Sequence, residues 1–177
     1  PCAFMDAYDP KTVFSSIDHL GRYSYMNQPK IAQWNLARFA ETLLTLIDKD
    51  INKSVEIAEE IINKFPEVYQ EKWLNMMRSK LGLFEEHESD LQIITDLLAW
   101  MVDNNADYTN TFRSLSQFEK PNSELYRGEK FQNWYKRWQN RLQKNSESIE
   151  SSVDLMKSSN PAVIPRNHKV EETLEAA

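Results

Sequence analysis

The spacing of apolar residues limits the fold of this chain more than any other feature of its sequence. From residue 31 onward the apolar residues recur at intervals of three and four, which places them on one face of an α-helix. No segment alternates apolar and polar residues in the way of a half-buried strand. The sequence therefore predicts an all-α fold, a multi-helix bundle.

Turn residues divide this pattern into separate helices. Pro66 should end one helix, Gly82 should follow the end of another, and Pro121-Asn122 should form a break. Residues 1–29 hold three prolines and aromatic residues without a helical period, which is typical of an ordered, irregular segment. We expect one domain with an irregular stretch at 1–29 and a helical domain at 30–177. The helices are predicted at 31–47, 55–65, 69–81, 90–101, 108–115, 125–142 and 149–156, and from residue 169.

Composition excludes several classes of protein. The 177 residues are 41% hydrophobic and 27% charged, which is typical of a globular, water-soluble domain. The net charge of −6 repels a polyanion, so we expect no nucleic-acid partner. No apolar run approaches the roughly 18 to 20 residues of a spanning helix, and the first residues lack a secretion signal. These features predict a cytoplasmic protein without a membrane partner.

Residues typical of phosphate and metal sites are scattered. The three glycines lie too far apart for a phosphate-binding loop, and the three histidines and single cysteine form no zinc-binding motif. Asp103, Asn105 and Asp107 match the first ligands of a calcium loop, but Tyr108 and Ser114 stand where that loop needs Gly and Glu. We therefore expect these Asp and Asn residues to cap helices.

The predicted helix at 125–142 carries the only local excess of positive charge. Its aromatic residues could form a stacking platform for single-stranded nucleic acid. Alternatively, Trp134, Trp138 and Leu142 form a core stripe while the basic head groups lie in water, and this interpretation is favoured. Between residues 127 and 144 there are one acid, Glu129, and six basic residues: Arg127, Lys130, Lys136, Arg137, Arg141 and Lys144.

Several short motifs resemble the selenoprotein O family of protein adenylyltransferases. The resemblance spans essentially the whole chain in the expected order, and it implies that the chain is a fragment. The motifs are PCAFMDAYDP at 1–10, SIDHLGRY at 16–23, NQP at 27–29, WNL at 34–36, DYTNTFR at 107–113, NP at 160–161 and IPRN at 164–167.

This resemblance implies a kinase-like enzyme, a pseudokinase that passes AMP from ATP to a Ser, Thr or Tyr hydroxyl of a protein substrate. The family's nucleotide loop, phosphate-binding residues, catalytic Asp and metal ligands would all precede Pro1, and its terminal cysteine or selenocysteine would follow Ala177. The resemblance thus implies ATP and Mg²⁺ for the full-length protein. For the fragment it implies no catalytic, nucleotide-binding or metal residue, no cofactor and no activity of its own.

Four residues of the irregular segment are candidate contacts with a protein substrate. By analogy with kinases, the segment would follow the metal-binding motif and border the place where the substrate docks. Asp6, Asp9 and Asp18 could bind a metal, although turns and helix caps use the same residues. Arg22 should either tether one of these aspartates or meet the substrate, and the tether is favoured.

The same segment raises the question of partners. In the family it should lie against the catalytic core, so the fragment should self-associate, or the segment should fold back onto its own helices. The alternative function is a free-standing helical protein-interaction module. The apolar residues concerned are Phe4, Met5, Tyr8, Val13, Phe14, Ile17, Tyr23 and Tyr25.

Overall fold

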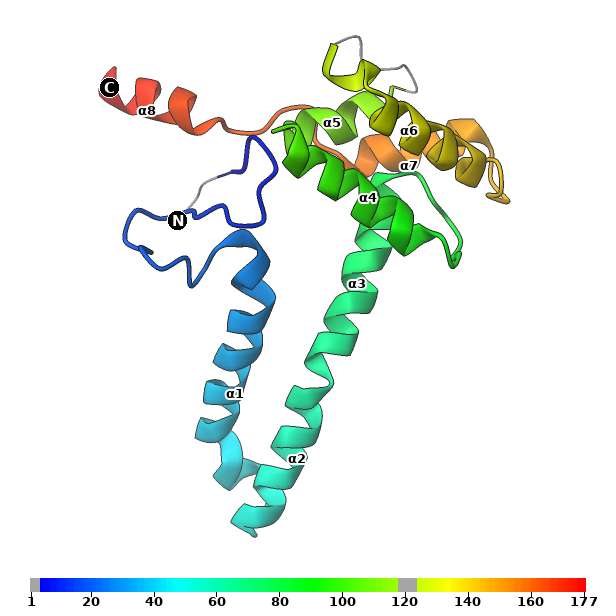
Figure 1. Ribbon diagram of the computed structural model, residues 1–177. Coiled ribbons are helices and arrows are strands. Elements are labelled where there is room, and N and C mark those ends of the chain that lie inside the picture. The colour runs from blue at the N-terminus through cyan, green and yellow to red at the C-terminus, as the bar shows by residue number, and fades with distance from the viewer. Residues whose placement is uncertain (1–3, 118–123) are drawn as a thin grey trace. The chain divides into compact units, whose positions relative to one another are not determined.

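A computed structural model describes residues 4–117 and 124–177 (Figure 1). Over these residues the prediction of an all-α fold is confirmed, since the only β pairing there is an isolated antiparallel bridge between Ala7 and Asp107. The break expected at Pro121-Asn122 lies outside them. The α-helices are α1 (Gln28–Ile47), α2 (Ile51–Asn63), α3 (Phe65–Lys80), α4 (Asp90–Asp103), α5 (Tyr108–Leu115), α6 (Glu129–Leu142), α7 (Ile149–Ser159) and α8 (Asn167–Glu175), with 3₁₀ turns η1 (Tyr25–Asn27) and η2 (Glu124–Arg127).

Most helix ends fall where the turn residues place them, with two corrections. Helix α2 ends at Asn63, and Pro66 lies in the first turn of α3, where its missing N–H costs nothing. The single helix predicted over 125–142 is wrong. Gly128 has an extended backbone with φ −59° and ψ 144°, so it separates η2 from α6 and forms the N-cap of α6.

Gly82 closes α3 in a Schellman motif. The Leu83 N–H donates to the Arg78 carbonyl at 2.9 Å, and the Gly82 N–H donates to the Ser79 carbonyl at 3.1 Å. Gly82 has φ +71°, and a Cβ atom there would lie 2.9 Å from the Ser152 carbonyl oxygen. Both the backbone conformation and the close approach of α7 therefore require glycine at this position.

The chain packs into two compact units. The residues up to Asp9 together with Leu74–Ala177 form one unit, which we call the helical body, and Pro10–Trp73 form the other, which we call the hairpin unit. The domain boundary expected after residue 29 stays a prediction. Among the described residues no helix is both long and apolar enough to span a bilayer.

Helix α6 supplies the centre of the helical body's core. Trp134 and Trp138 stack with their ring centroids 5.9 Å apart, and both side chains are almost completely buried. The Trp134 indole N–H donates to the Ile93 carbonyl at 2.8 Å, and the Trp138 indole N–H donates to the Leu81 carbonyl at 2.9 Å. The core-stripe interpretation is therefore confirmed, because rings buried in this way offer no face to a nucleic-acid base.

The basic residues of α6 do not all lie in water as expected. Arg137 forms an ion pair with Asp96 of α4 at 2.6 Å while remaining half exposed. Arg141 is different, because only 3% of its surface is exposed. The expectation that its head group is solvated is wrong, and the reason is a buried carboxylate that faces it from α4.

That carboxylate belongs to Asp90, which is completely buried. Asp90 accepts hydrogen bonds from Nε of Arg78 at 2.9 Å, from Nε of Arg141 at 2.7 Å and from the His87 N–H at 2.9 Å. Burial by itself raises the pKa of this carboxyl group, but the hydrogen bonds from Arg141, the backbone N–H and Arg78 outweigh it and lower the pKa. Asp90 therefore stays ionised and joins α3, α4 and α6.

The hairpin unit is built differently. Helices α1 and α2 run antiparallel side by side, and Asp50 caps α2 by accepting the Asn52 N–H at 2.9 Å (Figure 1). Every residue from 10 to 73 is described, and the buried ones are Ser24 and Ser54, both polar. The apolar stripes predicted at 31–47 and 55–65 are thus not enclosed, because two helices that meet along one seam leave the rest of each face in water.

We expect the Trp138→Ala variant to lose about 3 to 5 kcal/mol of unfolding free energy, because it leaves a cavity in the core of the helical body. Replacing both Lys136 and Arg137 by Gln should cost no more than about 1 kcal/mol, since these charges are exposed or half exposed. Urea denaturation measures both. A double charge change that proves the more destabilising would contradict this assignment of α6.

Asp90→Asn should be far more destabilising than its matched control Asp96→Asn. The first change leaves two buried arginines without a counter-charge, which costs about 3 to 5 kcal/mol. The second removes one partner of the half-exposed Arg137, and such pairs contribute at most about 1 kcal/mol. Thermal and urea unfolding should give clearly different free energies of unfolding for the two variants. Equal losses of unfolding free energy would show that the buried network around Asp90 is not the main source of stability in the helical body.

Candidate functional site

The first described residues pair with the turn that precedes α5. The Tyr8 N–H donates to the Ala106 carbonyl at 2.9 Å, and the Tyr108 N–H donates to the Asp6 carbonyl at 2.8 Å. The rings of Tyr8 and Tyr108 stack at 5.5 Å. Residues 4–9 are therefore held in one register against the helical body, as the fold-back alternative expected for part of the irregular segment.

Asp6 takes part in a cluster of three charged side chains. Nη1 of Arg166 donates to Oδ1 of Asp6 and, at 2.6 Å, to Oδ2 of Asp107, while Nη2 lies 3.4 Å from Oδ1 of Asp107. The hydrogen bonds from Arg166 to Asp107 and then to Asp6 raise the pKa of the guanidinium. We call Asp6, Asp107 and Arg166 the clasp.

Arg166 lies in the IPRN motif at 164–167, but the sequence alone suggested no role for it. The capping role expected near Asp107 is confirmed, because Oδ1 of Asp107 accepts the Asn110 N–H at 2.7 Å at the start of α5. Asp103 instead forms an exposed ion pair with Lys130 at 3.4 Å. In the described ranges no three His, Cys, Asp or Glu side chains come together as a metal site would need.

Asp9 is an exposed residue at the end of the same segment. Its backbone N–H lies 3.5 Å from the sulfur of Met5, and Met5 itself is buried with 8% of its surface exposed. Tyr8 is buried to the same extent. The apolar residues of the segment therefore divide into two groups, since Met5 and Tyr8 are covered whereas Ile17 remains 84% exposed.

Asp18 and Arg22 form a turn in the hairpin unit. The Asp18 carboxylate accepts the N–H groups of Arg22 and Tyr23, both at 2.8 Å, and Gly21 completes the turn with φ +65°. Asp18 is thus bonded to the backbone of Arg22. The Arg22 guanidinium instead lies over the Trp34 ring, 4.8 Å from its centroid. Of the four predicted contacts, Asp6 and Asp9 lie in the helical body, while Asp18 and Arg22 lie in the hairpin unit.

Lys80 is a buried cation beside Tyr108, the residue on which the Tyr8 ring stacks. Its Nζ atom lies 5.3 Å from the Tyr108 ring centroid and 4.7 Å from that of Phe112. Burial lowers the pKa of the Lys80 ammonium to about 8. Sequence reasoning missed this residue, because a lysine near the end of a helix is ordinarily solvated.

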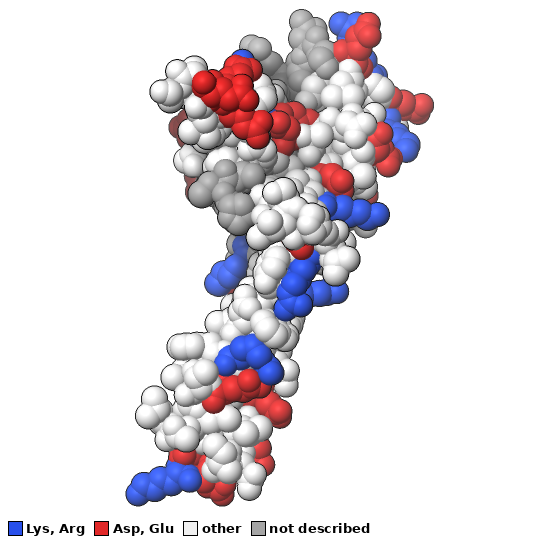
Figure 2. All heavy atoms as spheres, turned by 90° about the vertical axis from the view of Figure 1, so that its left-hand side faces the viewer, with Lys and Arg blue, Asp and Glu red and all other residues white. Residues whose placement is uncertain are grey.

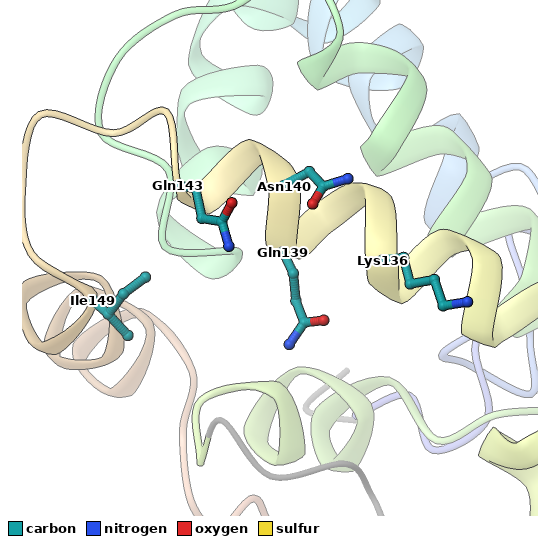
Figure 3. A pocket seen from close by; sticks show the side chains of 5 residues that line it. All are labelled: Lys136, Gln139, Asn140, Gln143 and Ile149. Carbon is teal, nitrogen blue, oxygen red and sulfur yellow. The ribbon is translucent and has the colours of Figure 1, made fainter.

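A shallow hollow of about 250 Å³ lies along α6 (Figure 3). Figure 3 shows side chains of α6 at its rim, with Ile149 at the start of α7 on one side. The described lining offers one ammonium group and three amides and includes no carboxylate. It therefore lacks the acidic ligands with which proteins usually hold Mg²⁺. The lining residues are Lys136, Gln139, Asn140, Gln143 and Ile149.

Comparison with known proteins extends the resemblance. The family model described as protein adenylyltransferase SelO matches residues 1–177. A protein nucleotidyltransferase YdiU of Nitrosococcus oceani is 56% identical over 176 residues, which are 99% of this chain and 36% of that protein. Those of Alcanivorax borkumensis and Pelagibacter ubique are 56% and 54% identical over the whole chain and 37% of their own lengths.

The chain spans little more than a third of the length of these curated relatives. The match covers every residue of the chain, including the motifs at 1–10, 107–113 and 164–167 that first suggested it. The resemblance to the selenoprotein O family is thereby confirmed. This chain belongs to the SelO family of protein adenylyltransferases.

Proposed function

We propose that the longer protein transfers AMP from ATP to Ser, Thr or Tyr hydroxyls of protein substrates, and that this chain forms its helical portion. The observation that carries the proposal is the SelO family match over all 177 residues. The relatives support it, because each is named a protein nucleotidyltransferase. We further propose that the protein acts in the cytoplasm.

We propose that ATP and Mg²⁺ bind elsewhere than at the buried arginines and the hollow described above. Nucleotidyl transfer needs oxygen ligands for the metal and cationic groups that clamp the phosphates. Here the buried arginines Arg78 and Arg141 are committed to Asp90, and the hollow along α6 contains no carboxylate. We therefore assign the nucleotide and Mg²⁺ to the part of the longer protein outside this chain.

We assign the substrate side of the reaction to the irregular segment. Asp9 and Arg22 are exposed, and Asp6 and Asp18 are held by the clasp and by the turn. Exposed charged groups on an anchored backbone suit contacts with a protein substrate, because their positions are fixed before binding. These four residues are proposed as substrate contacts and not as catalytic residues.

Titration of ATP and Mg²⁺ into this chain, followed by calorimetry, should show no saturable binding. The longer protein should bind ATP and add AMP to a protein substrate, which mass spectrometry detects as an adenylyl adduct. A dissociation constant in the low micromolar range for the chain alone would contradict the assignment of the nucleotide site to the rest of the protein.

We also propose that the isolated chain self-associates through its hairpin unit. The exposed apolar residues include Phe39 at 60% and Leu46 at 80% exposure. Figure 2 shows groups of both signs along the helical stem in the lower part of the view, with uncharged surface beside them. The same surface supports the alternative function, a free-standing interaction module.

Light scattering coupled to gel filtration should find a dimer or larger species for the native chain, because burying exposed apolar side chains is favourable by roughly 1.5 to 3 kcal/mol each. Phe39→Asp should shift the chain toward monomer. The control Leu174→Asp, at an exposed apolar position of α8, should not. A native chain that is monomeric at high concentration would refute self-association.

A further inference from the structure

Arg166 joins parts of the chain that are far apart in sequence. One nitrogen of its guanidinium reaches both Asp6, 160 residues away, and Asp107, 59 residues away. Arg166 is the N-cap residue of α8, and that helix buries none of its own side chains. The clasp, together with a 3.3 Å hydrogen bond from Asn167 to the Phe4 carbonyl, therefore links the start of α8 directly to residues 4–9.

The described contacts of residues 4–9 with the helical body differ in how they act on the register of the segment. The backbone makes two hydrogen bonds to the turn at 106–108, the Tyr8 ring stacks on Tyr108, and the side chains of Met5 and Tyr8 are buried. Apolar burial is non-directional, so it holds the segment down without fixing its register. The clasp adds a directional, charge-assisted constraint at Asp6, next to the residue pair of the bridge.

The charges of the clasp make Arg166 its essential member. Asp6 and Asp107 both contact the same guanidinium nitrogen, so their carboxylates lie close together. Only part of each group is exposed, at 48% for Asp6, 26% for Asp107 and 22% for Arg166, and water screens the interaction incompletely. Without the guanidinium the two carboxylates repel each other, which pushes residues 4–9 away from the turn.

We propose that Arg166 is a positioning residue that fixes the register of residues 4–9 against the helical body. By doing so it sets the positions of Asp6 and Asp9 for the protein substrate, and this second part rests on the proposed function. Lysine cannot replace it fully, because its single nitrogen has no counterpart of Nη2, which lies beside Oδ1 of Asp107, and an ammonium group lacks the planar geometry that matches a carboxylate.

Two backbone amides report directly on this register. The amides of Tyr8 and Tyr108 donate the hydrogen bonds that pair the segment with the turn. Hydrogen exchange followed by NMR on this chain should show roughly tenfold faster exchange at both amides in Arg166→Gln, and an intermediate increase in Arg166→Lys. The Leu83 amide, which closes α3, should be unchanged and serves as the internal reference.

A second substitution separates charge repulsion from general damage. Adding Asp6→Asn to Arg166→Gln removes the repulsion, so exchange at the two amides should return to within about threefold of native. Lys169→Gln is the matched control, because it removes one positive charge from an exposed ion pair on α8 and should leave both amides at the native rate. Asp6→Asn alone should raise their exchange by about threefold.

Exchange within about twofold of native in Arg166→Gln, or failure of Asp6→Asn to restore it, would overturn the proposal. If Arg166→Gln does not fold, exchange at the native rate in Asp6→Asn alone would also overturn the proposal.

Activity of the longer protein tests the substrate part of the proposal. There, kcat/KM for AMP transfer to the protein substrate should fall most in the variants whose two amides exchange fastest. If a variant exchanges faster at the two amides but transfers AMP as fast as the native protein, the claim that Arg166 positions the substrate contacts is overturned. A native protein that transfers no AMP would refute the proposed function, and the role of the clasp in fixing the register would then be judged from hydrogen exchange alone.

Discussion

The buried carboxylate of Asp90 is the interaction on which the helical body depends. It binds two arginines, Arg78 of α3 and Arg141 of α6, and each arginine extends the contact further. Arg141 also donates to the Glu85 carbonyl at 2.6 Å and to the side chain of Asn145, which in turn donates to the Gly82 carbonyl at 2.8 Å. One ionised group thus fixes how α3, the following loop, α4 and α6 meet, and geometry of this quality offsets the cost of removing three charges from water.

The two units differ in how many stabilising interactions lie within each of them. The helical body has this network and a core of stacked aromatic rings around Trp134 and Trp138. The hairpin unit buries only Ser24 and Ser54 and leaves its apolar faces in water. The chain spans about a third of its relatives' length, and we propose that the rest of the longer protein covers these apolar faces.

Local features of the fold could be predicted from the sequence, because each depends on neighbouring residues. The apolar period located the helices, Gly82 marked the end of α3, and Asp107 was expected to cap a helix. Gly128 was missed because its extended backbone interrupts an unbroken apolar pattern. The pairing of Asp90 with Arg141 and of Asp6 with Arg166 could not be found, since each joins charges across 51 or more residues and local periodicity holds no such information.

The most direct test of this account compares hydrogen exchange over residues 10–73 in the isolated chain, at a concentration where it is monomeric, with the same residues in the longer protein. We expect the amides of α1 and α2 to exchange rapidly in the chain and to become protected in the longer protein, while those of α4 and α6 are protected in both. Strong and equal protection of α1 and α2 in both proteins would contradict the account and support a self-sufficient interaction module.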